Sequence, residues 1–146
     1  MSGFTFSRGA AGAVLAAACL GAPIASAPQA AAATAPRITV AMAGSALGAA
    51  GTASVGCAQT VVATLQRPDG SPVNNGKIDF FSHLAGISGN FVGTAPVSGG
   101  TAHMVWAPDI AGSHVISAIY YDGDPDMQQA VGSVVVNALN LGGICL

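Results

Sequence analysis

From Thr34 onward the chain consists of short apolar runs separated, about every ten residues, by glycine, proline, asparagine or aspartate. Apolar and polar residues alternate within the runs, and a two-residue period places successive side chains on opposite faces of an extended strand. No segment after Thr34 shows the 3.6-residue period of an amphipathic helix. The pattern therefore predicts an all-β fold, a sandwich or a barrel.

The longest alternating run ends at Tyr121 and begins near Ser113. Its alternation puts His114, Ile116, Ala118 and Tyr120 on one face, which we expect to point into the core. About seven strands are predicted, the number that a minimal antiparallel sandwich needs. They are expected near residues 38–42, 57–65, 77–81, 91–97, 101–107, 113–121 and 131–138.

The connections between these runs carry the residues that favour turns. Pro68, Asp69 and Gly70 predict one turn, and Gly99 and Gly100 predict a tight hairpin between the fourth and fifth strands. Alternation along the strands gives the expected core. Besides Ile116, Ala118 and Tyr120 of the longest run, it comprises Val61, Ala63, Leu65, Ile78, Phe80, Ala102, Met104, Trp106, Val134 and Val136.

The first third of the chain has a different composition. Residues 1–8 are polar with one positive charge, and residues 9–20 are small and apolar, as in the n-region and h-region of a secretory signal. We expect a signal peptide and processing region at 1–33 and a single domain at 34–146. A buried alanine-rich helix is the alternative. Cys19 follows three alanines and loosely resembles a lipoprotein acylation site, although a second processing zone lies downstream, so lipidation is the less favoured reading.

The overall charge argues against several partner classes. The chain has four Lys plus Arg, six acidic residues and a formal net charge of −2, which is not the basic surface that nucleic acid or an anionic membrane attracts. The apolar content of 51% is raised by alanine in the first fifty residues, and no later apolar run has the eighteen or so residues of a membrane span. We expect no nucleic acid partner and no membrane span in the mature chain.

Four segments resemble bacterial immunoglobulin-like (Ig-like) modules of the Big_3 type, which occur in secreted and surface proteins. They are residues 60–65 (TVVATL), 76–81 (GKIDFF), 100–108 (GTAHMVWAP) and 112–120 (GSHVISAIY), in this order. The resemblance covers about Arg37 to Ala138 and implies an Ig-like β-sandwich in a cell-envelope or extracellular protein. The segments at 100–108 and 112–120 look most like the versions of this module found in actinobacteria. The cysteines, the single copy and an extra residue after Tyr120 depart from the pattern.

Two cysteines remain after removal of a signal peptide, Cys57 and Cys145, and an even pair in an exported chain indicates a disulfide. In an Ig-like sandwich the second strand starts at the end where the last strand finishes, so the two would approach each other. Closing a loop of about 90 residues would contribute about 4 kcal/mol on the chain-entropy model. Pairing of Cys145 with another chain is the alternative.

Other residues suggest weaker sites. Asp122, Asp124 and Asp126 alternate as at the start of a calcium loop, but Met127 and Ser133 stand where such a loop has glycine and glutamate, so a plain polar turn is favoured. The histidines fall on separate segments: His83 is expected in a loop, His103 on an outward face and His114 in the core. We therefore expect no metal, no cofactor and no catalytic residue.

Aromatic residues could form an exposed platform for a sugar or a protein, with Phe81, Phe91, Trp106 and Tyr121 as the candidates. Core use of Trp106 and Phe80 is the favoured reading. Taken together, the sequence predicts a non-catalytic secreted or cell-envelope Ig-like module with a structural, adhesive or protein-interaction role. A carbohydrate-binding or enzyme-accessory domain is the alternative. The expected partner is an envelope or extracellular protein, or else a cell-wall polysaccharide.

Overall fold

A computed structural model describes residues 34–43, 51–84, 89–121 and 127–145. These residues belong to one compact unit, Ala31–Leu146. They form eight strands and no helix. The strands are β1 (Arg37–Ala43), β2 (Thr52–Ser54), β3 (Gln59–Gln66), β4 (Lys77–Leu84), β5 (Asn90–Pro96), β6 (Thr101–Trp106), β7 (Gly112–Tyr121) and β8 (Ala130–Leu139).

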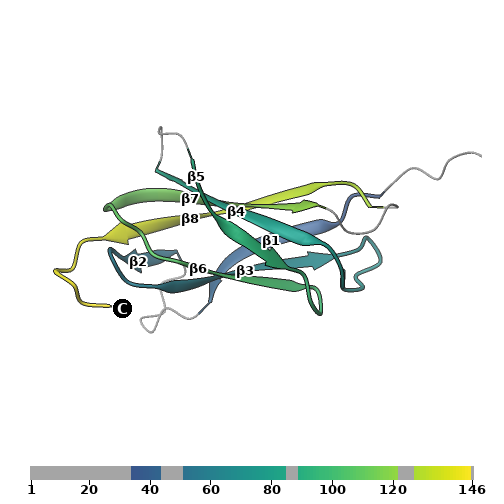
Figure 1. Ribbon diagram of the computed structural model, residues 1–146, viewed down its shortest axis with the longest axis horizontal. Helices are drawn as coiled ribbons and strands as arrows, with labels where there is room; N and C mark the ends of the chain where they lie inside the picture. The colour runs from purple at the N-terminus through teal and green to yellow at the C-terminus, as the bar shows by residue number, and fades with distance from the viewer. Residues whose placement is uncertain (1–33, 44–50, 85–88, 122–126, 146) are drawn as a thin grey trace, which may run out of the picture. The chain divides into compact units, whose positions relative to one another are not determined.

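The strands form two sheets that face each other (Figure 1). The smaller sheet has the order β1-β3-β6, and the larger has the order β2-β8-β7-β4-β5. In chain order β1, β3 and β6 correspond to strands A, B and E of an Ig-like sandwich, and β4, β7 and β8 correspond to strands C, F and G. The fold is therefore an all-β, Ig-like sandwich, as the sequence predicted.

One strand was not expected. β2 pairs in parallel with the end of β8, with Thr52 opposite Asn137 and Ser54 opposite Leu139. It is only three residues long and has no alternating pattern of its own, so periodicity could not reveal it. The other pairings between strands are antiparallel, and the predicted seven strands each match one of the remaining elements within a few residues.

The core lies between the sheets and is built from alternate residues of each strand. Tyr120, Phe80, Leu65, Ile78 and Ile116 are the largest of its fully buried side chains. The predicted inward residues are buried, except that Met104 and Val134 are only partly covered. The prediction missed further buried apolar residues, namely Val40, Ala53, Val73, Ala95, Val97, Ala130 and Ala138.

Two details differ from the sequence-based expectations. His83 lies within β4, where it pairs with Val115 of β7, and not in a loop. The segment Ser98–Thr101 does close a tight turn, but β5 and β6 then enter different sheets instead of continuing as a hairpin. Among the described residues, no helix is long and apolar enough to cross a membrane.

Candidate functional site

The splitting of β5 from β6 creates an opening on one side of the sandwich. Ser98 and Thr101 exchange two backbone hydrogen bonds, of 2.9 and 3.0 Å, at the point where the two strands meet. Beyond it β5 pairs with β4 and β6 pairs with β3, so the two strands separate along their length. Both are edge strands of their sheets.

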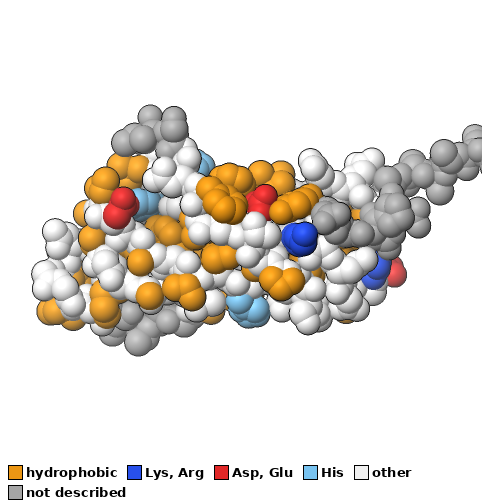
Figure 2. Space-filling model, viewed as in Figure 1, with side chains coloured by type: hydrophobic (Ala, Val, Ile, Leu, Met, Phe, Trp, Pro, Cys, Tyr) orange, Lys and Arg blue, Asp and Glu red, His pale blue; other side chains and the backbone are white. Residues whose placement is uncertain are grey.

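A hollow of about 250 Å³ lies in this gap. Its walls come from the end of β4, the start of β5, the end of β6 and the loop that follows β6. The lining residues are Ser82, Asn90, Val92, Val105, Trp106, Ala107 and Asp109. Figure 2 shows one face of the molecule, on which apolar and uncharged side chains predominate and charged side chains are isolated.

Three polar side chains contribute to the hollow, and they come from three different segments. Ser82 is buried on the inner face of β4, Asn90 begins β5, and Asp109 lies in the loop after β6. No hydrogen bond joins these side chains to another residue in the part of the chain that the structure describes. Within the described ranges, these three side chains therefore have no protein partner that a ligand would have to displace.

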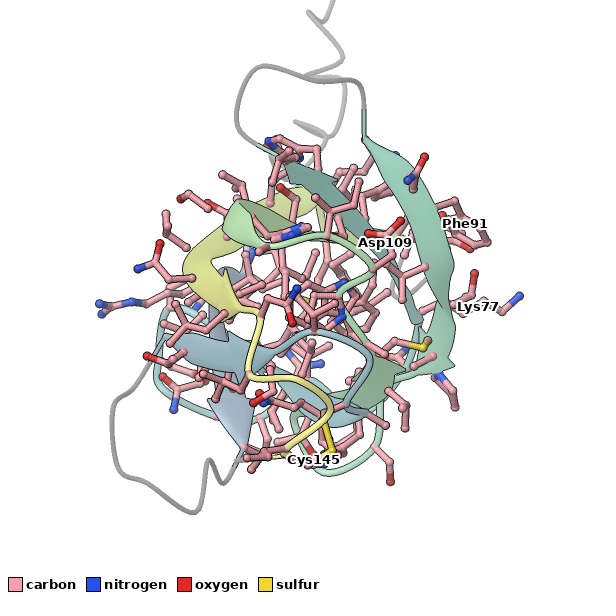
Figure 3. All side chains as sticks on the ribbon, turned by 90° about the vertical axis from the view of Figure 1, so that its left-hand side faces the viewer. Lys77, Phe91, Asp109 and Cys145 are labelled. Atoms are coloured by element: carbon pink, nitrogen blue, oxygen red, sulfur yellow. A yellow bond between two sulfur atoms is a disulfide. The ribbon has the colours of Figure 1, made fainter. Side chains whose placement is uncertain are left out.

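The loop that carries Asp109 is fixed on both sides. The Pro108 carbonyl accepts a 2.8 Å hydrogen bond from the Gly56 N–H. The Ile110 carbonyl accepts a 2.8 Å hydrogen bond from Nε2–H of His114. Asp109 is thus held between two anchored neighbours, and Figure 3 shows it on the same side of the molecule as Phe91 and Lys77.

His114 also contacts Trp106, a residue that lines the hollow. Its ring is 4% exposed and packs edge-on against Trp106, with the ring centroids 5.4 Å apart. Trp106 is 5% exposed, and part of it lines the hollow. The prediction that His114 and Trp106 serve the core is confirmed, and both side chains also position the walls of this site.

The outer face of the large sheet is the second exposed feature. On it Phe91 of β5 is 60% exposed and contacts Phe81 of β4 edge-on, at 5.6 Å between centroids. Asp79 lies near this pair and accepts hydrogen bonds from Thr94 and Tyr121. β8 adds exposed Val131, Val135 and Leu139. Of the four aromatic candidates for a platform, Phe81, Phe91 and Tyr121 lie on this face, and Trp106 is buried in the core.

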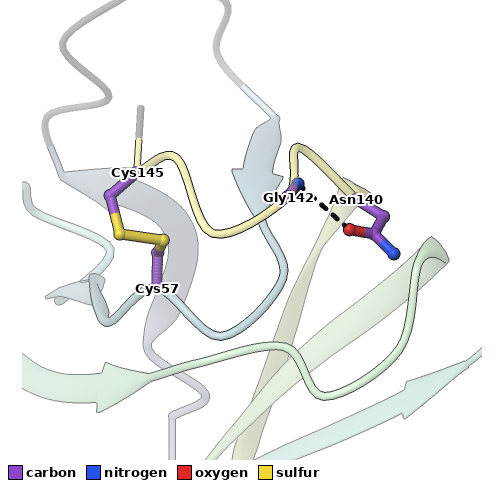
Figure 4. Close-up of a disulfide and its surroundings, with 4 residues drawn as sticks. All are labelled: Cys57, Asn140, Gly142 and Cys145. Atoms are coloured by element: carbon purple, nitrogen blue, oxygen red, sulfur yellow. Dashed lines mark hydrogen bonds between the residues drawn. A yellow bond between two sulfur atoms is a disulfide. The ribbon is translucent and has the colours of Figure 1, made fainter.

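The structure joins Cys57 and Cys145 by a disulfide bond, with their Cα atoms 5.5 Å apart (Figure 4). The bond ties the segment after β8 to the segment between β2 and β3. Within that tail the Gly142 N–H donates to the Asn140 side chain at 3.2 Å. Cys57 is buried, and this is consistent with a structural role for the bond.

Other predicted site residues give no cluster. Cys19, Asp122, Asp124 and Asp126 lie outside the described residues. His83, His103 and His114 lie on β4, β6 and β7, and the described residues contain no group of three His, Cys, Asp or Glu side chains that could hold a metal ion. Sequence reasoning missed Ser82, Asn90 and Asp109 because their proximity depends on the divergence of β5 and β6.

Comparison with known proteins gives distant structural matches. No family model and no curated protein sequence matches the chain. Among solved structures, the CARDB domain of a Pyrococcus furiosus protein, determined in complex with di-metal ions, has 15% identity and a TM-score of 0.46, covering 71% of this chain and 89% of its own.

Two further solved structures match at a similar level. A superoxide reductase (neelaredoxin) from Ignicoccus hospitalis has 10% identity and a TM-score of 0.46, over 72% of this chain and 80% of its own. The PKD domain of an M14-like peptidase from a Thermoplasmatales archaeon has 14% identity and a TM-score of 0.40, over 71% and 92%.

Proposed function

We propose that this protein is an exported, non-catalytic Ig-like module of the cell envelope or the extracellular medium, and that it acts by binding another protein. The observation that carries the proposal is the opening between β5 and β6, where an edge strand borders a hollow with three polar side chains that lack partners among the described residues. Hydrogen-bonding groups between apolar walls are suited to holding a ligand.

Two features support export. Residues 1–20 have the charge and apolar pattern of a secretory signal. The Cys57–Cys145 disulfide is the second feature, because disulfide bonds form and persist mainly in oxidising compartments outside the cytosol. Four segments resemble Big_3-type modules, most closely those of actinobacteria. This resemblance supports the proposal that the protein is a bacterial surface protein with a structural or adhesive role.

A carbohydrate-binding or accessory role is the second candidate. The hollow supports it, because it combines the Trp106 indole with the polar groups of Ser82, Asn90 and Asp109, and sugars are bound by aromatic faces together with hydrogen-bonding side chains. The charge and apolar character of the residues around the hollow fit a polypeptide equally well. A binding experiment must therefore distinguish a protein partner from a carbohydrate partner.

The proposal is tested by presenting both partner classes to the same protein. Disulfide-bonded protein lacking residues 1–33 is immobilised and exposed in parallel to envelope protein extract and to protein-free cell-wall polysaccharide. We expect saturable retention from the extract that is lost after protease treatment of the extract. Retention of polysaccharide alone, or of neither fraction, would contradict the proposal.

Export is tested by the intact mass of the protein recovered from the envelope and from the medium of a producing cell. We expect a chain that lacks the signal segment and is two hydrogens lighter than the reduced form. A full-length chain confined to the cell interior would overturn the export part of the proposal. A diacylglycerol-modified chain starting at Cys19 would place the protein on the membrane surface by lipidation.

A further inference from the structure

The four edge strands of the sandwich differ in how they are protected. Unprotected edges attract other strands, so proteins shield them with short strands, prolines, charges, bulges or neighbouring elements. β2 has three residues, and β5 has a register shift opposite Phe80 and Phe81 and ends in Pro96. β1 packs against β8, where Gly132 lies close to Ile38.

β6 has no proline, charge or bulge and is not a short strand; its neighbour is β5, whose Gly93 lies against the Met104 side chain. The sequence of β6, TAHMVW, contains no proline and no lysine, and its register with β3 is unbroken from Gln59↔Trp106 to Thr64↔Thr101. Among the described residues no strand pairs with its second side. Two side chains of this edge strand are exposed to solvent, Val105 (63% exposed) and His103.

The backbone groups that face this open side follow from the ladder. Leu65 N–H donates to the Gly100 carbonyl at 2.7 Å, which makes this pair a hydrogen-bonded one. Hydrogen-bonded and non-hydrogen-bonded pairs alternate in antiparallel sheets, so Ala102, Met104 and Trp106 direct their backbone groups to β3. His103 and Val105 therefore direct their N–H and C=O groups to the open side.

The side chains next to this edge define the chemistry of an occupant. A strand paired with the end of β6 would lie over the hollow and would point alternate side chains into it. Val92, Val105 and Trp106 provide apolar walls, while Asp109 is the charged member among the described residues that line the hollow. A lysine or arginine, with its aliphatic stem and cationic head, complements both features.

We propose that an extended segment of a partner polypeptide pairs with β6 through His103 and Val105, and that it places a lysine or arginine side chain in the hollow toward Asp109. This inference rests on the proposed function and names the surface and the partner chemistry. A second copy of this chain fits less well, because pairing β6 with β6 brings no lysine or arginine side chain to the hollow.

The test uses a labelled peptide, acetyl-Thr-Val-Thr-Lys-Thr-Val-Thr-amide, whose alternation puts Val, Lys and Val on one face. Binding to the disulfide-bonded domain is measured by fluorescence anisotropy. Two analogues carry N-methyl groups on alternate residues in opposite phases, and a third has norleucine in place of lysine. We expect saturable binding that one N-methylated phase abolishes and the other retains, because only one row of peptide amides faces β6.

The charge contact is tested with Asp109→Asn and with Asp69→Asn as the matched control, since both residues are exposed aspartates. We expect Asp109→Asn to weaken the lysine peptide about three- to tenfold, as for an exposed ion pair, and to leave the norleucine peptide unchanged. Asp69→Asn should leave both unchanged. Equal effects of the two variants would overturn the role of Asp109.

Strand pairing is tested from the protein side with Val105→Pro, which removes an N–H facing the open edge and none that bonds β3. We expect loss of peptide binding with the disulfide and the thermal transition retained. If Val105→Pro does not fold, the paired N-methyl peptides decide the question alone. Equal binding of both N-methylated phases would overturn pairing.

Two further outcomes would also overturn the inference. One is concentration-dependent dimerisation of the free domain that Val105→Pro abolishes, because a second copy would then occupy the edge. The other is absence of peptide binding at millimolar concentration while the domain still retains envelope proteins. That second result would refute this site and leave the proposed function standing, whereas retention of polysaccharide alone would refute the proposed function itself.

Discussion

Tyr120 and Tyr121 are neighbours on β7 and send their hydroxyl groups to opposite environments. Tyr120 is 1% exposed, and its hydroxyl has no hydrogen-bond partner among the described residues. The Tyr121 hydroxyl donates to Asp79 at 3.1 Å on the outer face of the same sheet. The alternation of a strand thus gives two chemically identical groups opposite energetic roles.

Replacing each tyrosine with phenylalanine should therefore have opposite effects. Tyr120→Phe removes a buried polar group without a protein partner, and we expect it to leave stability unchanged or raise it by up to about 1 kcal/mol. Tyr121→Phe removes a hydrogen bond to a carboxylate and should cost about 0.5–1.5 kcal/mol. Urea denaturation of the two variants measures both, and a larger loss for Tyr120→Phe would contradict this account.

The turn between β5 and β6 offers a second matched pair. Gly99 and Gly100 have positive φ angles of 58° and 76°, so alanine is strained at both positions. A Cβ atom at Gly99 would meet nothing within 4 Å, whereas at Gly100 it would lie 2.8 Å from Pro72 Cβ and 3.1 Å from the Leu65 carbonyl oxygen.

Gly99→Ala should cost about 1–2 kcal/mol through backbone strain. Gly100→Ala adds a collision with Cβ of Pro72 and a tight contact with the Leu65 carbonyl oxygen, and it should cost at least about 1 kcal/mol more. Chemical denaturation of both variants tests the difference. Equal losses would show that the contact with Pro72 and Leu65 relaxes without cost.

The Cys57–Cys145 bond closes a loop with a sequence separation of 88 residues. Reduction, or the double change Cys57→Ser with Cys145→Ser, should lower the free energy of unfolding by about 2–5 kcal/mol, mainly because the unfolded chain gains freedom. A lower melting temperature with unchanged far-ultraviolet circular dichroism is the expected signature. An unchanged melting temperature after verified reduction would speak against a stabilising bond.

Asp69 gives a prediction about pH. The Ser71 hydroxyl donates to Asp69 Oδ1 at 2.6 Å and the Ser71 N–H donates to the same atom at 2.9 Å, and these bonds lower the pKa of Asp69. A lowered pKa in the folded state means that the bonds stabilise the fold above the unfolded pKa and that this contribution is lost as the pH falls through the folded value.

Ser71→Ala removes the hydroxyl bond, which is the largest cause of the shift, and retains the backbone bond. We expect the pKa of Asp69 to rise toward its ordinary value without reaching it. Carboxyl ¹³C shifts followed by NMR across the acid range measure this directly. A pKa that does not move would show that the hydroxyl contact is not maintained in solution.

Alternation in the sequence was sufficient to predict the central strands and their inward residues. Ile116, Ala118 and Tyr120 lie in a long regular strand, where a period of two leaves one consistent core face. β2 could not be predicted this way, because its three residues pair in parallel with β8 through contacts that local sequence does not encode.

The candidate site was beyond sequence reasoning for a related reason. Ser82, Asn90 and Asp109 belong to segments that no local pattern brings together, and their proximity depends on β5 and β6 joining different sheets. The glycines at 99 and 100 predicted a hairpin, since turn chemistry is local, but the strand partners of β5 and β6 are determined by the whole sandwich.

Amide hydrogen exchange at β6 tests the central claim, the open edge, most directly. In the free disulfide-bonded domain, we predict strong protection of the Ala102, Met104 and Trp106 amides, which bond β3, and fast exchange at His103 and Val105. Adding the lysine peptide should protect His103 and Val105. Strong protection of those two amides in the free monomer, or no change on saturation with peptide, would contradict the account.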